Sequence, residues 1–505
     1  MGAMERVAVV DLGSNSFRLV VYAWGDGRWR RTDEIFEAVR IGAGVDESGA
    51  LGEDAMARAL ATIDVFAHFA RASGLTEDEQ VFVATSAIRE AANRDEFLTR
   101  ATAVAGTEVR VLDRDEEAKY GYLAAINSTT LSDGAVLDLG GGSMQLVKVA
   151  SRLTAAADSW RLGAVRMTER FLADGEPVSE KELDKLRTHV ARKLERADWL
   201  PGTQRLVGVG GTVRTLATAV QRAHELPDLG VQGQMMSTAD LDALIAALAE
   251  LPASRRATIH GIKAARADIV LAGAVVVRGA MEACGVEAIE VTEAGLREGV
   301  FFERMLATDP PLVDDVRLAS VMNLAAQFGV DPPHTQHVAA LATGLFDELA
   351  AAGLHAGDRH ERELLWAASV LHDIGMAVDY DDHHKHSRYL ILNAGLPGFT
   401  PREVALIAQI ARYHRKGLPS FGELAPLMDK GDQELLDRGA VLLRLAEDLE
   451  RSRDQAVREA HAVEEDGVVR LELVASGDTR VPKWAASRES ELFSRAFGRG
   501  LEVVG

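Results

Sequence analysis

Residues 136–147 read VLDLGGGSMQLV. Apolar residues flank one carboxylate and a run of three glycines, so the segment predicts a strand, a tight turn and a second strand. Successive glycine amides form a concave nest of N–H donors that suits phosphate, and Ser143 adds a hydroxyl group. Hairpins that bind nothing also contain glycine-rich turns, so a phosphate loop needs a second observation.

That observation is a second copy of the pattern at residues 7–21, VAVVDLGSNSFRLVV. Both stretches run from a strand through Asp-Leu-Gly and a small polar turn into another strand, with Asp11 and Asp138 in the same place. The repetition predicts two similar halves of one molecule. Each half would offer a phosphate loop to a shared cleft.

Length and composition narrow the class of protein. A chain of 505 residues is too long for one core and predicts three or four domains. Its single cysteine, Cys284, excludes an internal disulfide and fits a reducing compartment. The longest apolar run, residues 269–277, is too short to span a bilayer, and no signal peptide precedes the first predicted strand. We therefore expect a cytoplasmic protein without a membrane partner.

The formal net charge of -21 disfavours a general nucleic-acid binder, because such proteins neutralise phosphates with a basic face. A polyanionic substrate would need a local basic channel. The predicted helix around Lys185–Arg196 is one candidate for it. Acidic residues are interleaved there, so a solvated helix face is the alternative.

Two further segments of the first half carry candidate chemistry. A short strand at residues 81–85 leads into a helix that Ser86 would cap and that carries Arg89 in its first turn. A guanidinium at a helix N-terminus suits an oxyanion, and the alternative is a surface arginine paired to Glu90 or Asp95. A later helix opens with acidic residues that include Glu117, at the carboxyl end of a strand, where open α/β sheets gather their chemistry.

A third glycine turn follows at residues 205–216, RLVGVGGTVRTL. Strand, glycine pair and helix start make it a further anion site, and close packing of helix on strand is the alternative. A helix around residues 293–300 closes this region, and Thr308–Pro311 marks a linker.

The remainder is helical from about residue 313 to 462 and is rich in histidine, with nine of the fourteen histidines between His334 and His414. Adjacent His372 and Asp373, with further histidines and a distant aspartate, form a set that can converge on a divalent metal. After residue 463, apolar and charged residues alternate, which predicts a strand and then a helix near residues 484–497.

These stretches together resemble the exopolyphosphatase and guanosine-pentaphosphate phosphohydrolase family, within the actin-like ATPase superfamily. The matching segments span residues 5–305 in the family's order and are DLGSNSFR at 11–18, TSAIR at 85–89, EEA at 116–118, DLGGGS at 138–143, GGT at 210–212 and GLREG at 295–299. The remainder resembles the HD-type helical domain and small tail of longer members.

The resemblance implies an α/β fold with two actin-like (ribonuclease H-like) domains, at residues 1–127 and 128–308. An HD-like all-α domain at residues 313–462 and a small α+β segment at 463–505 would follow. Actin-like phosphatases often pair, and the sequence leaves a homodimer open.

The resemblance also implies the roles of site residues. Glu117 would be the catalytic base, Arg89 would clamp phosphoryl oxygens, and Asp11 and Asp138 would hold or orient a hydrated Mg²⁺. The implied substrate-binding residues are Asp11, Gly13, Ser14, Asn15, Ser16, Asp138, Gly140, Gly141, Gly142, Ser143, Gly210, Gly211 and Thr212. The chain departs from the family at Gln145, where the family commonly has Glu.

In the helical region the resemblance implies a second divalent metal. Its ligands would be His337, His372, Asp373, His386, His414 and Asp448. The final aspartate of HD proteins usually follows alanine directly, whereas Ala446 is followed by Glu447 and then Asp448. The alternative is a degenerate domain that serves packing and substrate length selection.

The expected activity is that of a Mg²⁺-dependent exopolyphosphatase, which removes terminal phosphate from inorganic polyphosphate. One alternative is the same chemistry on guanosine pentaphosphate. Another is a sensor that binds polyphosphate or a nucleotide without turnover, which Gln145 keeps open. A kinase or chaperone ATPase is disfavoured by residues 116–118 and 295–299.

Overall fold

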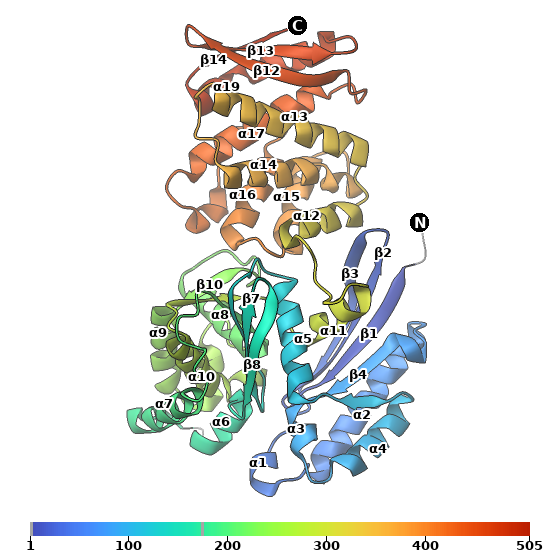
Figure 1. Cartoon of the computed structure of the whole chain (residues 1–505), viewed down its shortest axis with the longest axis vertical. Coiled ribbons are helices and arrows are strands. Elements are labelled where there is room, and N and C mark those ends of the chain that lie inside the picture. The colour runs from blue at the N-terminus through green and yellow to red at the C-terminus, as the bar shows by residue number, and fades with distance from the viewer. Residues whose placement is uncertain (1–3, 173–175) are drawn as a thin grey trace. The chain divides into compact units, whose positions relative to one another are not determined.

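The computed structural model describes residues 4–172 and 176–505 (Figure 1). The chain divides into two compact units. Unit 1 comprises the chain up to Glu225 together with Gly230–Val316, and unit 2 comprises Leu226–Leu229 with Arg317–Gly505. Each unit is described by itself.

Unit 1 contains two sheets, and the first has five strands in the order β3-β2-β1-β4-β5. Its strands are β1 (Glu5–Leu12), β2 (Phe17–Gly25), β3 (Arg28–Glu37), β4 (Gln80–Ala84) and β5 (Val109–Val111). Strands β1, β2 and β3 form an antiparallel meander, and β4 and β5 continue parallel to β1.

The second sheet of unit 1 has the order β10-β11-β9-β6-β7-β8. Its strands are β6 (Gly134–Leu139), β7 (Met144–Ala150), β8 (Leu153–Trp160), β9 (Leu206–Val209), β10 (Gln234–Ser237) and β11 (Ala288–Val291). It repeats the meander in β6, β7 and β8 and the two parallel strands in β9 and β11, and β10 adds an antiparallel edge. The predicted duplication is therefore confirmed at the level of topology.

Equivalent hairpins place the two predicted phosphate loops at equivalent points of the sheets. The turn between β1 and β2 is Gly13–Ser16, and the turn between β6 and β7 is Gly140–Ser143. In the paired strands Asp11 lies opposite Arg18, and Asp138 lies opposite Gln145.

Helices flank the sheets of unit 1. They are α1 (Val45–Ser48), α2 (Glu53–Ala72), α3 (Ser86–Glu90), α4 (Arg94–Ala105), α5 (Arg114–Ile126), α6 (Ala164–Phe171), α7 (Glu180–Leu194), α8 (Gly211–Ala223), α9 (Thr238–Ala249), α10 (Val270–Cys284) and α11 (Leu296–Met305). The longest apolar run lies mainly in α10, whose residues Val270–Val277 are all buried, so it serves as a core helix. Among the described residues no helix is long and apolar enough to cross a membrane.

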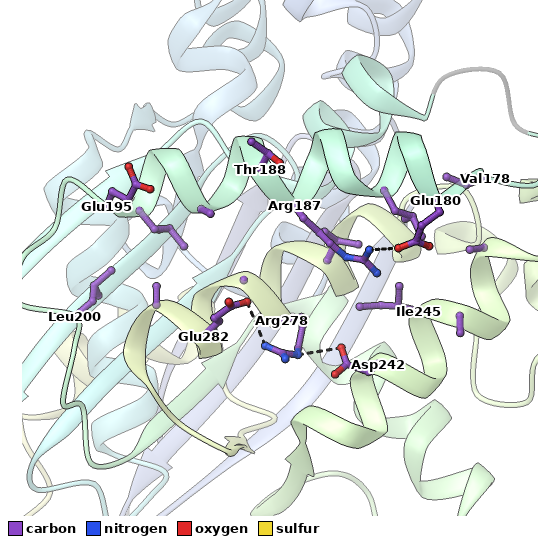
Figure 2. Close-up of a pocket in the computed structure, with 18 of the residues that line it drawn as sticks. Val178, Glu180, Arg187, Thr188, Glu195, Leu200, Asp242, Ile245, Arg278 and Glu282 are labelled. Atoms are coloured by element: carbon purple, nitrogen blue, oxygen red, sulfur yellow. Dashed lines mark hydrogen bonds and ion pairs between the residues drawn. The ribbon is translucent and has the colours of Figure 1, made fainter.

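A cavity of about 1090 Å³ lies between α7, α9 and α10 in unit 1 (Figure 2). Both arginines that line it pair with carboxylates of the same lining: Arg278 contacts Asp242 at 3.0 Å and Glu282 at 3.6 Å, and Arg187 contacts Glu180. Arg187 also contacts Asp184 on its own helix at 3.1 Å. This pairing favours a solvated face for the basic helix over a substrate channel.

Unit 2 has a helical core and a small sheet. Its helices are α12 (Val316–Gln327), α13 (Pro332–Ala351), α14 (Arg359–Leu371), α15 (His383–Ala394), α16 (Pro401–Arg412) and α17 (Asp432–Leu449). Strands β12 (Val457–Glu465), β13 (Val468–Ala475) and β14 (Gly500–Val504) form the sheet, with α18 (Arg480–Ala486) and α19 (Ser490–Phe497) between the last two strands.

The strand predicted from alternating apolar and charged residues after residue 463 is confirmed. It is β13, in which Val469, Leu471 and Leu473 are buried. The helix expected near residues 484–497 is two helices instead. A short 3₁₀ turn, Ser487–Glu489, interrupts it.

Candidate functional site

The two phosphate loops face one narrow cleft in unit 1, with a cavity of about 120 Å³. Residues of both loops line it, among them Asp11, Gly13–Ser16, Asp138, Gly140 and Gly141. The loops lie so close that a Cβ on Gly141 would come within 3.0 Å of the Ser14 Cβ. A larger residue would have to displace the neighbouring loop, so glycine suits the point where the two halves of unit 1 approach each other.

Helix α5 presents Glu117 to this cleft from its first turn. Asp113 caps the helix by accepting from the backbone N–H groups of Asp115 and Glu116, and Glu116 completes a capping box. The side chain of Glu117 is buried and lines the cleft. Its Oε2 accepts from Arg89 Nη1 at 2.8 Å, and its Oε1 accepts from Ser143 Oγ at 3.1 Å.

Burial raises the pKa of Glu117, and although Arg89 and Ser143 lower it, the net shift is upward. A carboxylate with a raised pKa is a better proton acceptor at neutral pH. The geometry and the pKa both suit a general base.

Arg89 lies in the short helix α3, as predicted, and the structure shows its partners. It pairs with neither Glu90 nor Asp95: its Nη1 donates to Glu117 and, at 2.8 Å, to the carbonyl oxygen of Leu112. It is also absent from the residues that line the cleft cavity. In this geometry Nη1 of Arg89 holds the Glu117 carboxylate, and Nη2 is buried without a hydrogen-bond partner among the described residues. The role of Arg89 as a clamp on phosphoryl oxygens stays a prediction.

Gln145 extends this set of contacts. The buried side chain donates from Nε2 to Ser143 Oγ at 3.0 Å. Since the hydroxyl oxygen accepts there, its hydrogen is left to donate to Glu117. A hydrogen-bonded chain thus runs from Gln145 through Ser143 to the carboxylate of Glu117.

Asp11 and Asp138 lie beside Glu117. Asp11 pairs with Arg297 at 3.1 Å, and burial raises its pKa more than the arginines lower it. Burial and then the charges of Glu117 and Asp11 raise the pKa of Asp138 to about 7. Three carboxylates that repel one another offer the hard oxygen ligands that Mg²⁺ prefers, so the residues fit this ion.

Four arginines line the same cleft, and sequence reasoning missed them as site residues: Arg18, Arg214, Arg266 and Arg297. Burial, followed by the charges of Arg214, Arg18 and Arg297, lowers the pKa of Arg266 to about 10. The guanidinium groups therefore repel one another in a pocket that suits an anion. Arg18 and Arg297 belong to the family-like stretches, whereas Arg266 lies in a 3₁₀ turn without a sequence signal.

The third glycine turn lies at the cleft only in part. Gly210 has a φ of 107°, which favours glycine, and a side chain on Gly211 would collide with the guanidinium of Arg266. Thr212, predicted as a binding residue, does not line the cavity and is buried. Its methyl group instead occupies the space where a side chain on Gly273 of α10 would lie, so close packing determines its position.

Unit 2 brings together part of the predicted metal set. His372, Asp373 and His414 are buried close to one another. His334 and His383 join them, in two groups of three that share Asp373. Glu447 completes the cluster, with Oε2 at 3.2 Å from His334 Nε2 and 3.4 Å from His372 Nε2.

The predicted set is corrected at three positions. His337 lies on α13 one turn after His334, and its Nε2 contacts the carbonyl oxygen of Val457 at 2.8 Å. His386 lies one turn after His383 on α15 and belongs to neither group. Asp448 lies beside Arg451, because helical rotation turns the neighbouring Glu447 to the cluster instead.

Two family models match the chain. The Ppx/GppA phosphatase family matches residues 20–308, and domain III of Ppx/GppA phosphatases matches residues 316–479. The chain belongs to the Ppx/GppA phosphatase family. Its two sheets are accordingly those of actin-like domains with mixed α/β sheets.

Similar proteins of known sequence or structure support this family assignment. The chain is 29% identical over 443 residues to a guanosine-5'-triphosphate,3'-diphosphate pyrophosphatase of Vibrio vulnificus, covering 87% of this chain and 86% of that one. A solved Ppx/GppA family member from Aquifex aeolicus is 28% identical with a TM-score of 0.52, over 59% of this chain and 97% of that one. An exopolyphosphatase structure from Cytophaga hutchinsonii, 24% identical with a TM-score of 0.55, shows the same fold over 59% of this chain and 97% of that one.

Proposed function

We propose that unit 1 is a Mg²⁺-dependent exopolyphosphatase, which hydrolyses the terminal phosphoanhydride of inorganic polyphosphate and releases orthophosphate. The observation that carries the proposal is the cluster of four arginines facing the carboxylate base Glu117 in one narrow cleft. In a chain with a formal net charge of -21, such a local concentration of positive charge is expected where a polyanion binds.

The size and lining of the cleft support a phosphate chain as the substrate. Its cavity of about 120 Å³ is lined by glycines, small polar side chains and arginines, and no aromatic side chain is among the described lining residues. Pockets that bury a drug-sized ligand usually have several hundred Å³ and apolar or aromatic walls. A terminal phosphate group matches the size and lining of the cleft better than a nucleobase does.

Different residues of the cleft would bind the substrate and activate the water. Backbone N–H groups of Gly13–Ser16 and Gly140–Ser143 would bind the oxygens of the terminal phosphoryl group, and the arginines would bind the next phosphates. Glu117, held by Arg89 and Ser143, would take a proton from the attacking water as the phosphoanhydride bond breaks. The products are orthophosphate and a chain shorter by one phosphate.

Asp11 and Asp138 would hold the Mg²⁺ ion through its water ligands. The ion would offset the charge that develops on the phosphoryl oxygens. The upward shifts in the pKa values of Asp11, Asp138 and Glu117 are the observation that supports a cation here.

A second candidate function is hydrolysis of the 5'-terminal phosphate of guanosine pentaphosphate. The relative from Vibrio vulnificus, which carries that activity in its name, supports it across 87% of this chain. Both substrates present a terminal anhydride to the same cleft.

The test is phosphate release from long-chain polyphosphate and from guanosine pentaphosphate with Mg²⁺. Glu117→Gln should lower kcat by about 100-fold or more, because general bases contribute about that much. The matched control is Glu116→Gln in the same helical turn, which keeps a side-chain acceptor for the backbone N–H of Asp113 and should retain activity. The ratio of kcat/KM for the two substrates identifies the preferred one.

Two outcomes would overturn the proposal. A Glu117→Gln variant as active as wild type would show that Glu117 is not the general base. Binding of both substrates to wild type without phosphate release would make the cleft a sensor.

A further inference from the structure

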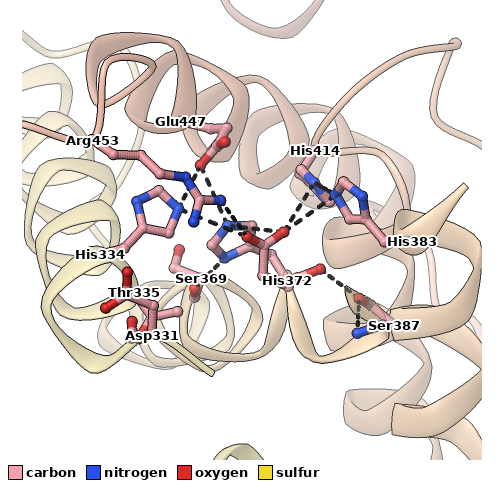
Figure 3. A network of polar contacts seen from close by, with 12 residues as sticks. Asp331, His334, Thr335, Ser369, His372, His383, Ser387, His414, Glu447 and Arg453 are labelled. Carbon is pink, nitrogen blue, oxygen red and sulfur yellow. Dashed lines mark hydrogen bonds and ion pairs between the residues drawn. The ribbon is translucent and has the colours of Figure 1, made fainter. Parts of the chain in front are cut away.

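Unit 2 holds a second cluster of ionisable side chains that the proposed function does not use (Figure 3). It gathers residues from the ends of five helices: His334, His372, Asp373, His383, His414 and Glu447. Donor atoms of His334, His372 and Asp373 lie within 4.8 Å of one another, and so do those of Asp373, His383 and His414. Asp373 belongs to both groups.

The orientation of three imidazole rings is fixed by the backbone. Nδ1 of His372 lies 2.7 Å from the carbonyl oxygen of Ser369, and Nδ1 of His414 lies 2.7 Å from that of Ala411. Nδ1 of His383 likewise lies 2.8 Å from the carbonyl oxygen of Tyr380. A carbonyl oxygen can only accept, so Nδ1 of His372 and of His414 carries the hydrogen, and each of these neutral rings keeps its lone pair on Nε2. Metal-binding histidines show this arrangement. Nδ1 of His383 also lies 3.3 Å from Nη1 of Arg415, which can only donate, so its contacts are compatible with either tautomer.

The Nε2 atoms of His383 and His414 and the carboxylate of Asp373 face one another. Nε2 of His383 and Nε2 of His414 are 3.0 Å apart, and Nε2 of His383 is 3.2 Å from Asp373 Oδ1. The lone pair of His414 and the carboxylate of Asp373 repel each other unless His383 donates a hydrogen from Nε2 or a metal ion lies between them. This side of the cluster is therefore completed by a hydrogen on His383 or by a metal ion.

The other side of the cluster has buried polar atoms that no hydrogen on His383 can satisfy. Both ring nitrogens of His334, Nε2 of His372 and Oε2 of Glu447 are buried and make no hydrogen bond to a described residue. The side chains of His334 and His372 are at most 2% exposed. A proton shared by His383 and His414 would leave these atoms unsatisfied, at a cost of about 1–3 kcal/mol for each group.

We propose that these six side chains form a centre for two divalent metal ions, bridged by the carboxylate of Asp373. His334, His372 and Glu447 complete the ligands of the first ion, and His383 and His414 those of the second. Imidazole together with carboxylate suits Mn²⁺, Fe²⁺ or Zn²⁺ better than Mg²⁺.

The second ion faces a pocket of about 710 Å³ and has only three protein ligands. Asp373, His383 and His414 all line this pocket, which leaves coordination positions for an external ligand. Six cationic side chains also line it: Arg415, Lys416, Arg444, Arg451, Arg453 and Arg488. Since only four carboxylates oppose them, bound metal would make the pocket strongly positive, and the ligand it takes is a phosphate-bearing anion.

The test measures metal in the full-length chain after removal of metal, loading with Mn²⁺ and desalting. Wild type should retain two more Mn²⁺ ions per chain than Asp373→Asn. His334→Asn and His383→Asn should each retain one fewer than wild type, because each removes a ligand of one ion. The control His386→Asn, on the same helix as His383 but outside both groups, should match wild type.

Electron paramagnetic resonance provides a readout that does not depend on activity. Wild type should give the signal of a magnetically coupled Mn²⁺ pair, and His383→Asn should give that of an isolated ion. Equal metal content in wild type and Asp373→Asn, or an uncoupled wild-type signal, would overturn the two-ion centre. Since the wild-type signal needs no variant, a variant that fails to fold leaves the proposal testable.

Inorganic phosphate tests the ligand class in the same experiment. Phosphate added to the Mn²⁺-loaded wild type should change the coupled signal, because it enters the coordination sphere of the ion that faces the pocket. A coupled signal that phosphate leaves unaltered would overturn the assignment of a phosphate-bearing ligand.

Discussion

Gln145 controls the direction in which the hydroxyl group of Ser143 donates. Its amide donates to Ser143 Oγ, and the hydroxyl hydrogen then stabilises the ionised form of Glu117. A glutamate at this position would accept that hydrogen and place a further negative charge beside the base. Both effects raise the pKa of Glu117.

We therefore expect Gln145→Glu to move the acidic limb of the pH–rate profile upward by about one pH unit. The profile of phosphate release with Mg²⁺ measures the shift. Ser159→Ala, which removes only the 3.4 Å contact on the other side of Gln145, should leave that limb in place. An acidic limb at the same pH in Gln145→Glu and wild type would contradict the relay.

Asp138 makes unit 1 less stable as the pH rises. Burial and the neighbouring carboxylates raise its pKa from 3.8 to about 7 in the folded state. Between these values the folded chain binds a proton that the unfolded chain has released, so the free energy of unfolding falls as the pH increases through this range.

Without metal, Asp138→Asn should therefore raise the free energy of unfolding by about 1–2 kcal/mol at pH 8 and leave it unchanged at pH 4. The side chain is only partly buried, so screening by solvent keeps the gain well below the full effect of the shift in pKa. Denaturant unfolding in the presence of a chelator measures both values. An equal gain at the two pH values would show that the effect does not come from titration.

Residues in repeated motifs could be placed from the sequence, and residues without a local pattern could not. Asp11 and Asp138 precede equivalent turns, so their convergence follows from the duplicated hairpins. Arg266 reaches the cleft from a 3₁₀ turn far along the chain, and only the tertiary fold brings it over Gly211. The roles assigned to all these residues stay predictions.

At the scale of elements, the contact between α5 and α11 holds the base in place. Helix α11 carries Arg297, which pairs with Asp11, and α5 carries Glu117. Gly299 lets the two helices approach, because a Cβ there would overlap the backbone of Tyr120. Any larger residue must force the two helices apart.

Gly299→Ala should destabilise unit 1 by about 1–3 kcal/mol and lower phosphate release with it. The matched control is Gly344→Ala in helix α13, where a Cβ would meet nothing within 4 Å. That change should stabilise its helix by about 0.5–1 kcal/mol, as alanine does in open helical positions. Thermal unfolding and activity of both variants test the prediction, and equal effects would refute the role of the close approach.

Periodicity predicted the regular elements well and the irregular ones poorly. Helix α2, Glu53–Ala72, could be predicted from the sequence, because its apolar spacing and the following Gly74 define both ends. The bounds of α15 were not predictable: Asp382 precedes it in a left-handed conformation with a φ of 54°. That start turns His383, and not His386, toward Asp373.

At the scale of the whole molecule, the two units should respond to different perturbations. The sheets of unit 1 and the helices of unit 2 have separate hydrophobic cores. The calorimetric unfolding of the chain should therefore show two transitions. Gly299→Ala should lower the midpoint temperature of only one transition, and that transition is then assigned to unit 1.

Removal of metal should then lower the other transition. A ligand present at about 100 times its dissociation constant adds about 2.7 kcal/mol to the folded state, and each kcal/mol shifts the midpoint of a unit of this size by about 2–4 °C. A chelator should thus lower the unit 2 midpoint of Mn²⁺-loaded wild type by about 5–10 °C, and that of Asp373→Asn by much less. Equal shifts in the two proteins would place the stabilising metal outside the Asp373 cluster, because that carboxylate is common to both groups of donor atoms.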